Sequence, residues 1–161
     1  MNKRISRLLW IFAFALGLRA CVVEPVRVTD ESMVPVLQDG DVVLVSKLHY
    51  GLRVPGAGSI LTEWRAPQKG DLVVAVAVGD PPISVLRRIS AVPGDTVTMP
   101  DGKSEVLKEG EFFLAAEQKE AADSRKLGPV SRKAIIGKAT YVWLAKKVDS
   151  PKSDWRMLQP L

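Results

Sequence analysis

Residues 70–78 read GDLVVAVAV, and this stretch decides the fold class. A Gly-Asp pair favours a turn, and the valines that follow favour a strand because β-branched side chains pack well on a pleated surface. The same arrangement returns at residues 40–45, GDVVLV, and at residues 94–99, GDTVTM. Residues 111–116, EFFLAA, and residues 134–145, AIIGKATYVWLA, are two further strand candidates. The repeated signal predicts a mainly β domain.

The rest of the chain beyond residue 25 contains no long helical period. We therefore expect packed sheets or a partial barrel around a core of Val, Ile and Leu. Residues 49–69 are rich in Gly and Pro and are interpreted as an extended loop. The tail, residues 146–161, has no clear period.

The beginning of the chain combines basic residues with an apolar run, LLWIFAFALGL, at residues 8–18. This pattern favours a basic cytoplasmic N-terminus at residues 1–5, a single transmembrane signal anchor at residues 6–23 and an extracytoplasmic β-rich domain at residues 24–161. The protein would then lie in the cell membrane. Two alternatives remain open: the sequence LRAC could mark Cys21 for lipidation, or the segment could be an ordinary cleaved signal peptide.

Charge and metal-binding residues exclude several classes of function. The formal net charge of +5 over 161 residues includes four positive charges before the first acidic residue, so the remainder carries only about +1, too little for a nucleic-acid surface. The single cysteine excludes an internal disulfide and a cysteine metal site. We expect no metal and no cofactor. A Ser-His-Asp triad would have to use His49, which no neighbouring residue orients as a base.

A candidate nucleophile lies in residues 30–35, DESMVP, where Ser32 precedes Met33 and Pro35. Further along follow LRRISAVPGDTV at residues 86–97 and ADSRKLGPV at residues 122–130. In this order and spacing the motifs resemble type I signal peptidases, membrane-anchored serine proteases that remove signal peptides from exported proteins. The resemblance covers nearly the whole chain.

The resemblance implies a mostly β fold with one membrane anchor and no cofactor. Its expected partners are membrane lipid and signal peptides or extended segments of exported proteins, bound as a strand with small residues, Ala-X-Ala, before the cut. It makes Ser32 the nucleophile. It also implies motif or substrate-binding roles for five residues: Met33, Pro35, Asp123, Ser124 and Arg125.

The chemistry differs from that of the family at several positions, including residues 116–118, AEQ, where the family typically has Gly-Asp-Asn. Active members use a neutral lysine as the base, and the resemblance puts Arg87 in its place; removing a proton from arginine near pH 7 costs at least about 7 kcal/mol. Ala121 replaces a serine that orients the lysine. Asp30 replaces a hydroxyl that donates to the oxyanion, and Glu31 replaces a glycine. These changes predict that catalysis is impaired or lost.

Two functions therefore compete. One is an endopeptidase in which another base, such as Lys119 or Lys133, reaches Ser32. The other is a non-catalytic binder or assembly chaperone for exported or pilus-like subunits. In either case we expect Arg87 to lie about 3 Å from Ser32 or from a carboxylate of Asp30 or Glu31, because a desolvated guanidinium requires hydrogen-bonded partners.

Overall fold

The computed structural model describes residues 6, 7, 10, 22–53, 59–77, 83–146 and 155–160. The expected N-terminus at 1–5 and most of the expected anchor at 6–23 lie outside these residues. Among the described residues, no helix has the length and apolar character needed to cross a membrane. Val23, which we had placed at the end of the anchor, begins the first strand.

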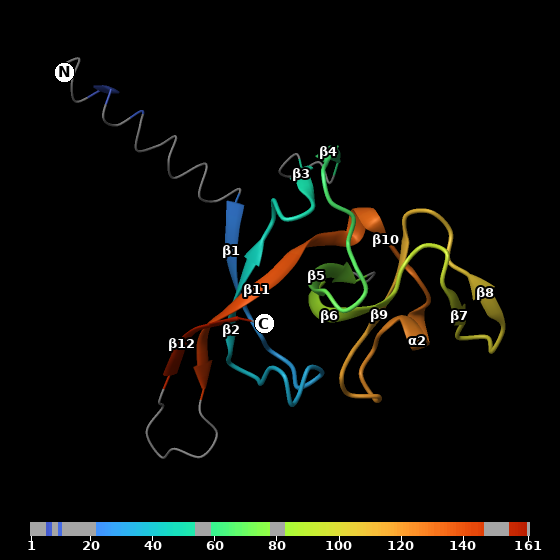
Figure 1. Ribbon diagram of the computed structural model, residues 1–161. Coiled ribbons are helices and arrows are strands. Elements are labelled where there is room, and N and C mark those ends of the chain that lie inside the picture. Colours follow the sequence, from blue (N-terminus) through green and yellow to red (C-terminus); the bar gives the residue numbers. More distant parts are fainter. Residues whose placement is uncertain are drawn as a thin grey trace.

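One sheet of eight strands dominates the described part of the chain (Figure 1). Its strands pair in the order β1-β2-β11-β5-β6-β9-β10, β12 also pairs with β11, and every pair is antiparallel. Their bounds are β1 (Val23–Arg27), β2 (Val42–Ser46), β5 (Leu72–Ala77), β6 (Ile83–Ala91), β9 (Glu111–Ala115), β10 (Val130–Ser131), β11 (Ile135–Lys146) and β12 (Trp155–Pro160).

Two short ribbons and two short helices complete the described elements. The ribbons are β3 (Gly51–Arg53) with β4 (Ile60–Glu63), and β7 (Thr96–Thr98) with β8 (Ser104–Val106). The helices are α2 (Ser124–Leu127) and the 3-10 turn η1 (Arg132–Ala134).

The mainly β prediction is confirmed, because all five apolar runs contain the strands expected of them: β2, β5, β7, β9 and β11. The interpretation of residues 49–69 as loop was wrong, since this segment contains the ribbon β3–β4. Strands β1, β6 and β12 were also not predicted from the sequence. These strands carry Pro, Arg or Ser among their apolar residues, and pairing with neighbouring strands holds them extended despite that composition.

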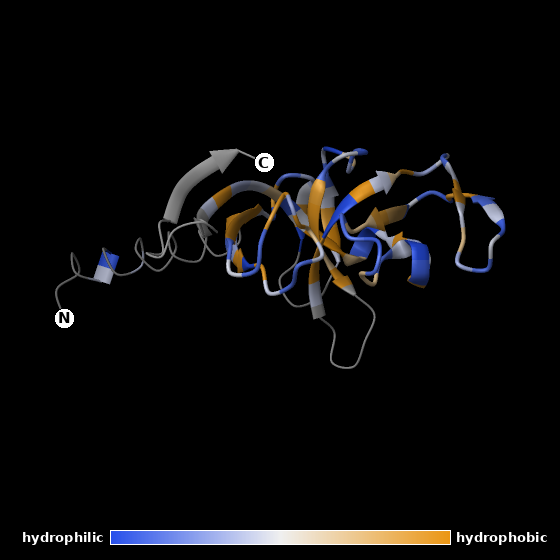
Figure 2. Cartoon of the chain, turned by 90° about the horizontal axis from the view of Figure 1, so that it is seen from below, coloured by the Kyte–Doolittle hydropathy of each residue, from blue (hydrophilic) through white to orange (hydrophobic). Residues whose placement is uncertain are grey.

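The core occupies both faces of the sheet, as β5 demonstrates. Leu72 and Val74 belong to one buried cluster, whereas Val73 and Ala75 belong to a second. Successive strand residues point to opposite faces, so a strand covered on both sides needs apolar residues at every position, which explains the unbroken valine run. Figure 2 shows hydrophobic residues concentrated on the central strands and hydrophilic residues in the turns and in α2.

The loop between β1 and β2 carries Ser32 and is fixed at several points. Met33 and Leu37 are completely buried, and the Leu37 N–H donates to Met33 O at 3.0 Å. At its base, Val28 N–H donates to Asp41 O at 2.8 Å and Gly40 N–H donates to Val28 O at 2.9 Å. The φ of +93° at Gly40 is one that residues with a Cβ rarely adopt. The fold therefore presents Ser32 from an anchored loop.

Candidate active site

Ser32 is nearly buried, with 7% of its surface exposed, and its hydroxyl has a partner on both sides. Ser32 Oγ donates to Asp30 Oδ1 at 2.6 Å and accepts from Arg87 Nη1 at 2.7 Å. The backbone N–H of Ser32 also points to Asp30 Oδ1, at 3.3 Å. One carboxylate oxygen therefore receives both hydrogen-bond donors of the serine.

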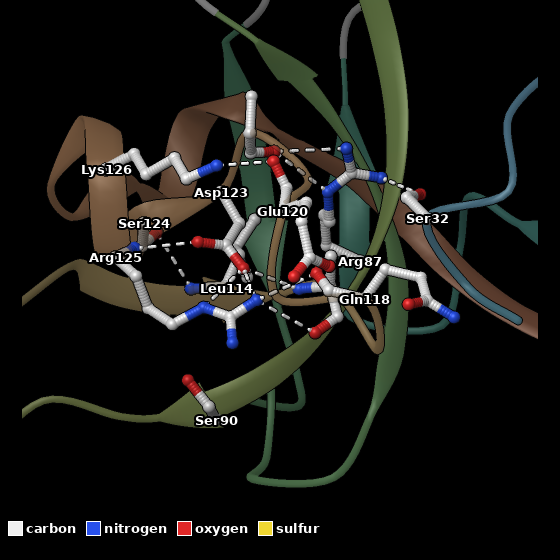
Figure 3. A network of polar contacts seen from close by, with 12 residues as sticks. Ser32, Arg87, Ser90, Leu114, Gln118, Glu120, Asp123, Ser124, Arg125 and Lys126 are labelled. Carbon is white, nitrogen blue, oxygen red and sulfur yellow. Dashed lines mark hydrogen bonds and ion pairs between the residues drawn. The ribbon is translucent and has the colours of Figure 1, made fainter.

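Arg87 enters the site from β6 and is only 4% exposed. Besides its bond to Ser32 (Figure 3), its guanidinium donates to Leu86 O at 2.6 Å and, through Nε and Nη2, to Ala122 O at 3.2 and 3.1 Å. Its Nη1 lies 3.6 Å from Asp30 Oδ2, a side chain that is half exposed. The expected direct contact of Arg87 with Ser32 is confirmed.

Gln118 holds the loop of Ser32 against the segment after β9. Its N–H donates to Ser32 O at 3.0 Å, and its side-chain Nε2 donates to Val34 O at 3.2 Å. Gln118 lies in the stretch 116–118 that departs from the family pattern, but the sequence did not indicate this contact. No local pattern signals this contact, because it joins two segments that only the folded chain brings together.

Asp123 and Arg125 form a second polar cluster beside the first (Figure 3). Arg125 donates through Nε to Asp123 Oδ2 at 2.8 Å and through Nη2 to the carbonyls of Ala116 and Gln118. Burial opposes ionisation of Asp123, but hydrogen bonds from the Arg125 side chain and from two backbone N–H groups outweigh it and leave its pKa below the ordinary value. This cluster supports Gln118, which in turn holds Ser32.

The other predicted site residues are distributed as follows. Ser124 is buried and accepts from Leu114 N–H at 2.9 Å, so it joins α2 to β9. Met33 lies in the core, while Pro35 and Glu31 are exposed. Within the described residues, no hydrogen bond or ion pair engages the Glu31 carboxylate, and Ala121 has only a backbone hydrogen bond to Gln118.

Neither lysine proposed as an alternative base contacts Ser32. Lys119 and Lys133 are both exposed, and the described hydrogen-bond partners of the Ser32 side chain are Asp30 and Arg87. In the described part of the chain no cluster of His, Cys, Asp or Glu could hold a metal ion.

His49 belongs to a different cluster and does not complete a triad. Its ring packs edge-on against Tyr50, whose hydroxyl donates to Asp71 at 2.8 Å. Its pKa is lowered, first by partial burial and then by the nearby charges of Lys138 and Arg65. The expectation that His49 is not a catalytic base agrees with this position.

An open groove of about 430 Å³ lies along β6 and β7. It is lined by Lys69, Ser90, Ala91, Asp95, Thr96, Val97, Thr98, Phe113 and Arg125. Because neither Ser32 nor Arg87 lines it, the groove is not the catalytic pocket.

Comparison with known proteins identifies a family for residues 1–106 and relatives that match about half of the chain. The family described as "Signal peptidase, peptidase S26" matches residues 1–106. Signal peptidase I of Pseudomonas fluorescens is 37% identical over 87 residues, which cover 54% of this chain and 31% of the relative. Signal peptidase I of Aquifex aeolicus is 33% identical over 97 residues, covering 60% of this chain and 33% of the relative.

A third relative comes from Arabidopsis thaliana and is called "Mitochondrial ATP-independent inner membrane protease subunit 2". It is 39% identical over 79 residues, covering 45% of this chain and 38% of the relative. The chain thus spans about a third of the length of the curated relatives it matches. The family match includes Ser32 and Arg87 but ends before Asp123.

Proposed function

The chain belongs to the signal peptidase family S26, and we propose that it binds signal peptides or extended segments of exported proteins while its peptidase chemistry is impaired or lost. The observation that carries this proposal is the Asp30–Ser32–Arg87 cluster, in which a carboxylate and a guanidinium hold the hydroxyl that would attack. Two separate requirements of serine catalysis are affected.

The first requirement is a base that removes the proton from Ser32. Arg87 occupies the position that the resemblance gives to lysine, and a guanidinium remains charged at any physiological pH. Asp30 does accept the proton of Ser32 in a hydrogen bond at 2.6 Å. However, a carboxylate is a far weaker base than the neutral amine that the family uses for this task.

The second requirement is a donor for the negative charge that develops on the substrate oxygen. In serine proteases the nucleophile's own N–H often supplies part of this oxyanion site. Here Asp30 Oδ1 lies 3.3 Å from that N–H and occupies the space in front of it. Its charge would also repel an oxyanion, and loss of one such donor costs about 3–4 kcal/mol.

Binding of an extended segment is compatible with these changes because it requires backbone groups rather than a base. Strand β1 forms one end of the main sheet's pairing order, and four of its five residues are exposed. It leads through residues 28–31 to Ser32. An extended peptide that pairs with this edge would therefore run toward the candidate site.

The proposal includes the topology expected from the sequence, an anchor followed by the β domain on the extracytoplasmic side of the cell membrane, except that the anchor must end before Val23, the first residue of β1. The basic flank and apolar run of the sequence support it, and one relative is named as an inner membrane protease. We expect the mass of the mature chain to include residues 1–21. A mature chain that begins at a lipidated Cys21 contradicts the anchor.

Cleavage of an Ala-X-Ala signal peptide by the detergent-solubilised full chain tests the proposed function. We expect a rate at or near background for the wild type, and the same rate for Ser32→Ala. Signal peptidase I of Pseudomonas fluorescens serves as the positive control. Rapid cleavage by the wild type that disappears in Ser32→Ala refutes the non-catalytic proposal and identifies Asp30, the carboxylate in contact with Ser32 Oγ, as the base to examine.

A further inference from the structure

The open groove of about 430 Å³ along β6 and β7, which we call the β7 groove, has a free strand edge as one wall. Thr96 and Thr98 line it, and β7 pairs with β8 on one side, while no described strand pairs with its other side. Asp95 O accepts from Leu107 N–H at 2.9 Å, so the carbonyl of residue 95 faces β8. Because backbone groups alternate in direction along an antiparallel strand, those of Thr96 and Thr98 face away from β8. The edge therefore offers two N–H and two C=O groups for which the described part of the chain supplies no partner.

The floor of the β7 groove is apolar and fixed. Val97 packs against the buried cluster that contains Ala91 and Phe113, two residues that also line the groove. These contacts hold the β7–β8 ribbon on β6 and β9. Ser90 Oγ, which also lines the groove, donates to Phe113 O at 3.0 Å and keeps its own lone pairs available as acceptors. The free edge is therefore held at a defined position beside an apolar surface, as strand addition requires.

Two cations line the β7 groove, and both retain hydrogen-bond donors. Arg125 uses Nε and Nη2 for Asp123 and for two carbonyls, whereas its Nη1 has no acceptor among the described residues. Figure 3 shows that unengaged nitrogen on the side of the guanidinium that faces Ser90. Lys69 Nζ lies 3.9 Å from Asp95 Oδ2, beyond hydrogen-bond distance, and the Lys69 side chain is 68% exposed. Since Asp95 is the single carboxylate among the lining residues, these donors favour an acidic group in the groove.

The β7 groove is separate from the candidate active site but shares a residue with its support. No residue of β1 or of the loop that carries Ser32 lines the groove. Arg125 donates through Nη2 to Gln118 O at 3.1 Å, and Gln118 N–H donates to Ser32 O at 3.0 Å. An acidic group bound to Arg125 Nη1 would therefore contact the arginine that supports the loop of Ser32 without entering the candidate active site.

We propose that the β7 groove binds an extended acidic segment of a partner polypeptide, which adds as a strand to the free edge of β7. Strand addition uses main-chain hydrogen bonds for affinity and side-chain contacts for specificity. Here the backbone groups of Thr96 and Thr98 supply the hydrogen bonds. Lys69 and Arg125 Nη1 supply the specificity by binding a carboxylate. This site is additional to the β1 edge of the proposed function, and it depends neither on the anchor nor on catalysis by Ser32.

Each change on the groove side has a matched control on the same ribbon. Thr98 and Ser104 are paired across β7 and β8, so their N–H groups point to opposite outer edges. The changes Thr98→Pro and Ser104→Pro each remove one outward N–H and leave the bonds between the two strands in place. For the charge, Lys69 lines the groove, whereas Lys103 lies outside it, is 76% exposed and pairs with Asp101 at 3.3 Å.

The probes are a fluorescein-labelled peptide, Thr-Val-Glu-Val-Thr, and a second peptide with Gln in place of Glu. Fluorescence anisotropy measures their binding to the detergent-solubilised full chain. We expect a Kd of about 1 mM or below for the Glu peptide, and binding of the Gln peptide that is weaker by at least roughly threefold. Thr98→Pro should weaken the binding of both peptides by at least roughly threefold, and Ser104→Pro should not. Lys69→Gln should lower the preference for the Glu peptide, and Lys103→Gln should leave this preference unchanged.

Absence of binding, or equal binding of the Glu and Gln peptides, overturns the proposal. Equal effects of Thr98→Pro and Ser104→Pro also overturn it, because the bound strand would then not lie on β7. Lys69→Gln changes an exposed side chain and tests the site even where Thr98→Pro disturbs the ribbon, so equal effects of Lys69→Gln and Lys103→Gln overturn the proposal as well. Displacement of the Glu peptide by an unlabelled Ala-X-Ala signal peptide would place it at the β1 edge and contradict the β7 site. Failure of the chain to bind that signal peptide counts against the proposed function alone.

Discussion

Asp30→Asn removes the carboxylate that lies nearest to the buried guanidinium of Arg87 while preserving the shape of the side chain. The two groups are 3.6 Å apart, so their attraction amounts to about 1 kcal/mol at the dielectric constant of water and about 5 kcal/mol at an effective value of 20. Because half of the Asp30 side chain is exposed, screening favours the lower part of this range. We expect Asp30→Asn to lower the free energy of unfolding by about 1–2 kcal/mol.

Urea unfolding of the detergent-solubilised chain, followed by tryptophan fluorescence, measures this change. Glu24→Gln is the matched control, since Glu24 is 49% exposed and contacts Lys47 at 2.7 Å, but Lys47 is itself 31% exposed. A surface pair of this kind contributes about 0.5 kcal/mol. A cycle with Arg87→Met and the double variant should give a coupling energy of about 1 kcal/mol. If Asp30→Asn costs no more than Glu24→Gln, or if the coupling is zero, Asp30 does not compensate the charge of Arg87.

Two further predictions concern catalysis and pH. Arg87→Lys alone should leave signal-peptide cleavage at background, because Asp30 stabilises the charged amine and Ala121 cannot orient it. Arg87→Lys combined with Ala121→Ser and Asp30→Ser should raise the cleavage rate by at least about tenfold. If Arg87→Lys alone increases the rate, Asp30 and Ala121 are not what prevents a lysine at position 87 from acting as the base. Since the pKa of Asp123 is lowered in the folded chain, its stabilising effect is complete above the ordinary value of about 3.9 and is lost as the pH falls through the lower folded pKa. Urea titrations should therefore show a smaller loss of stability below about pH 4 for Asp123→Asn than for the wild type, and equal losses refute the assignment.

The strands were predictable from the sequence wherever their own residue types favour β-structure. The valine run of β5 is buried on both faces and was recognised from residue types alone. Strand β6 was not recognised, because Ser84, Arg87, Arg88 and Ser90 interrupt its apolar pattern. Pairing with β5 and β9 holds this segment in a strand although its composition does not favour one. Residues within the segment give no sign of this pairing.

The candidate site was predictable in part for a different reason. Arg87 and Ser32 were expected to meet because the family resemblance places both at one site, and the hydrogen bond of 2.7 Å agrees. The same reasoning favoured Asp30 and Glu31 equally, although only Asp30 lies near Arg87. The backbone turn that follows Asp30 determines which of these two adjacent carboxylates lies near Arg87, and the sequence alone does not show this. Gln118 was recognised only as part of a stretch that departs from the family pattern, and its contact with Ser32 was not predicted because that contact depends on the packing of the whole domain.

The presence of Ser32 is explained by the structure without peptidase activity. A buried arginine needs acceptors for its N–H groups, and Arg87 finds them on three segments: Leu86 O on its own strand, Ala122 O before α2, and Ser32 Oγ on the loop after β1. A serine at position 32 is also able to donate to Asp30 while it accepts from Arg87. Alanine would leave one guanidinium N–H and one carboxylate oxygen without this partner, at a cost of about 1–3 kcal/mol. Retention of the serine is therefore expected whether the site cleaves peptides or only links these three segments, which is why the rate of Ser32→Ala, rather than the identity of residue 32, distinguishes the two functions.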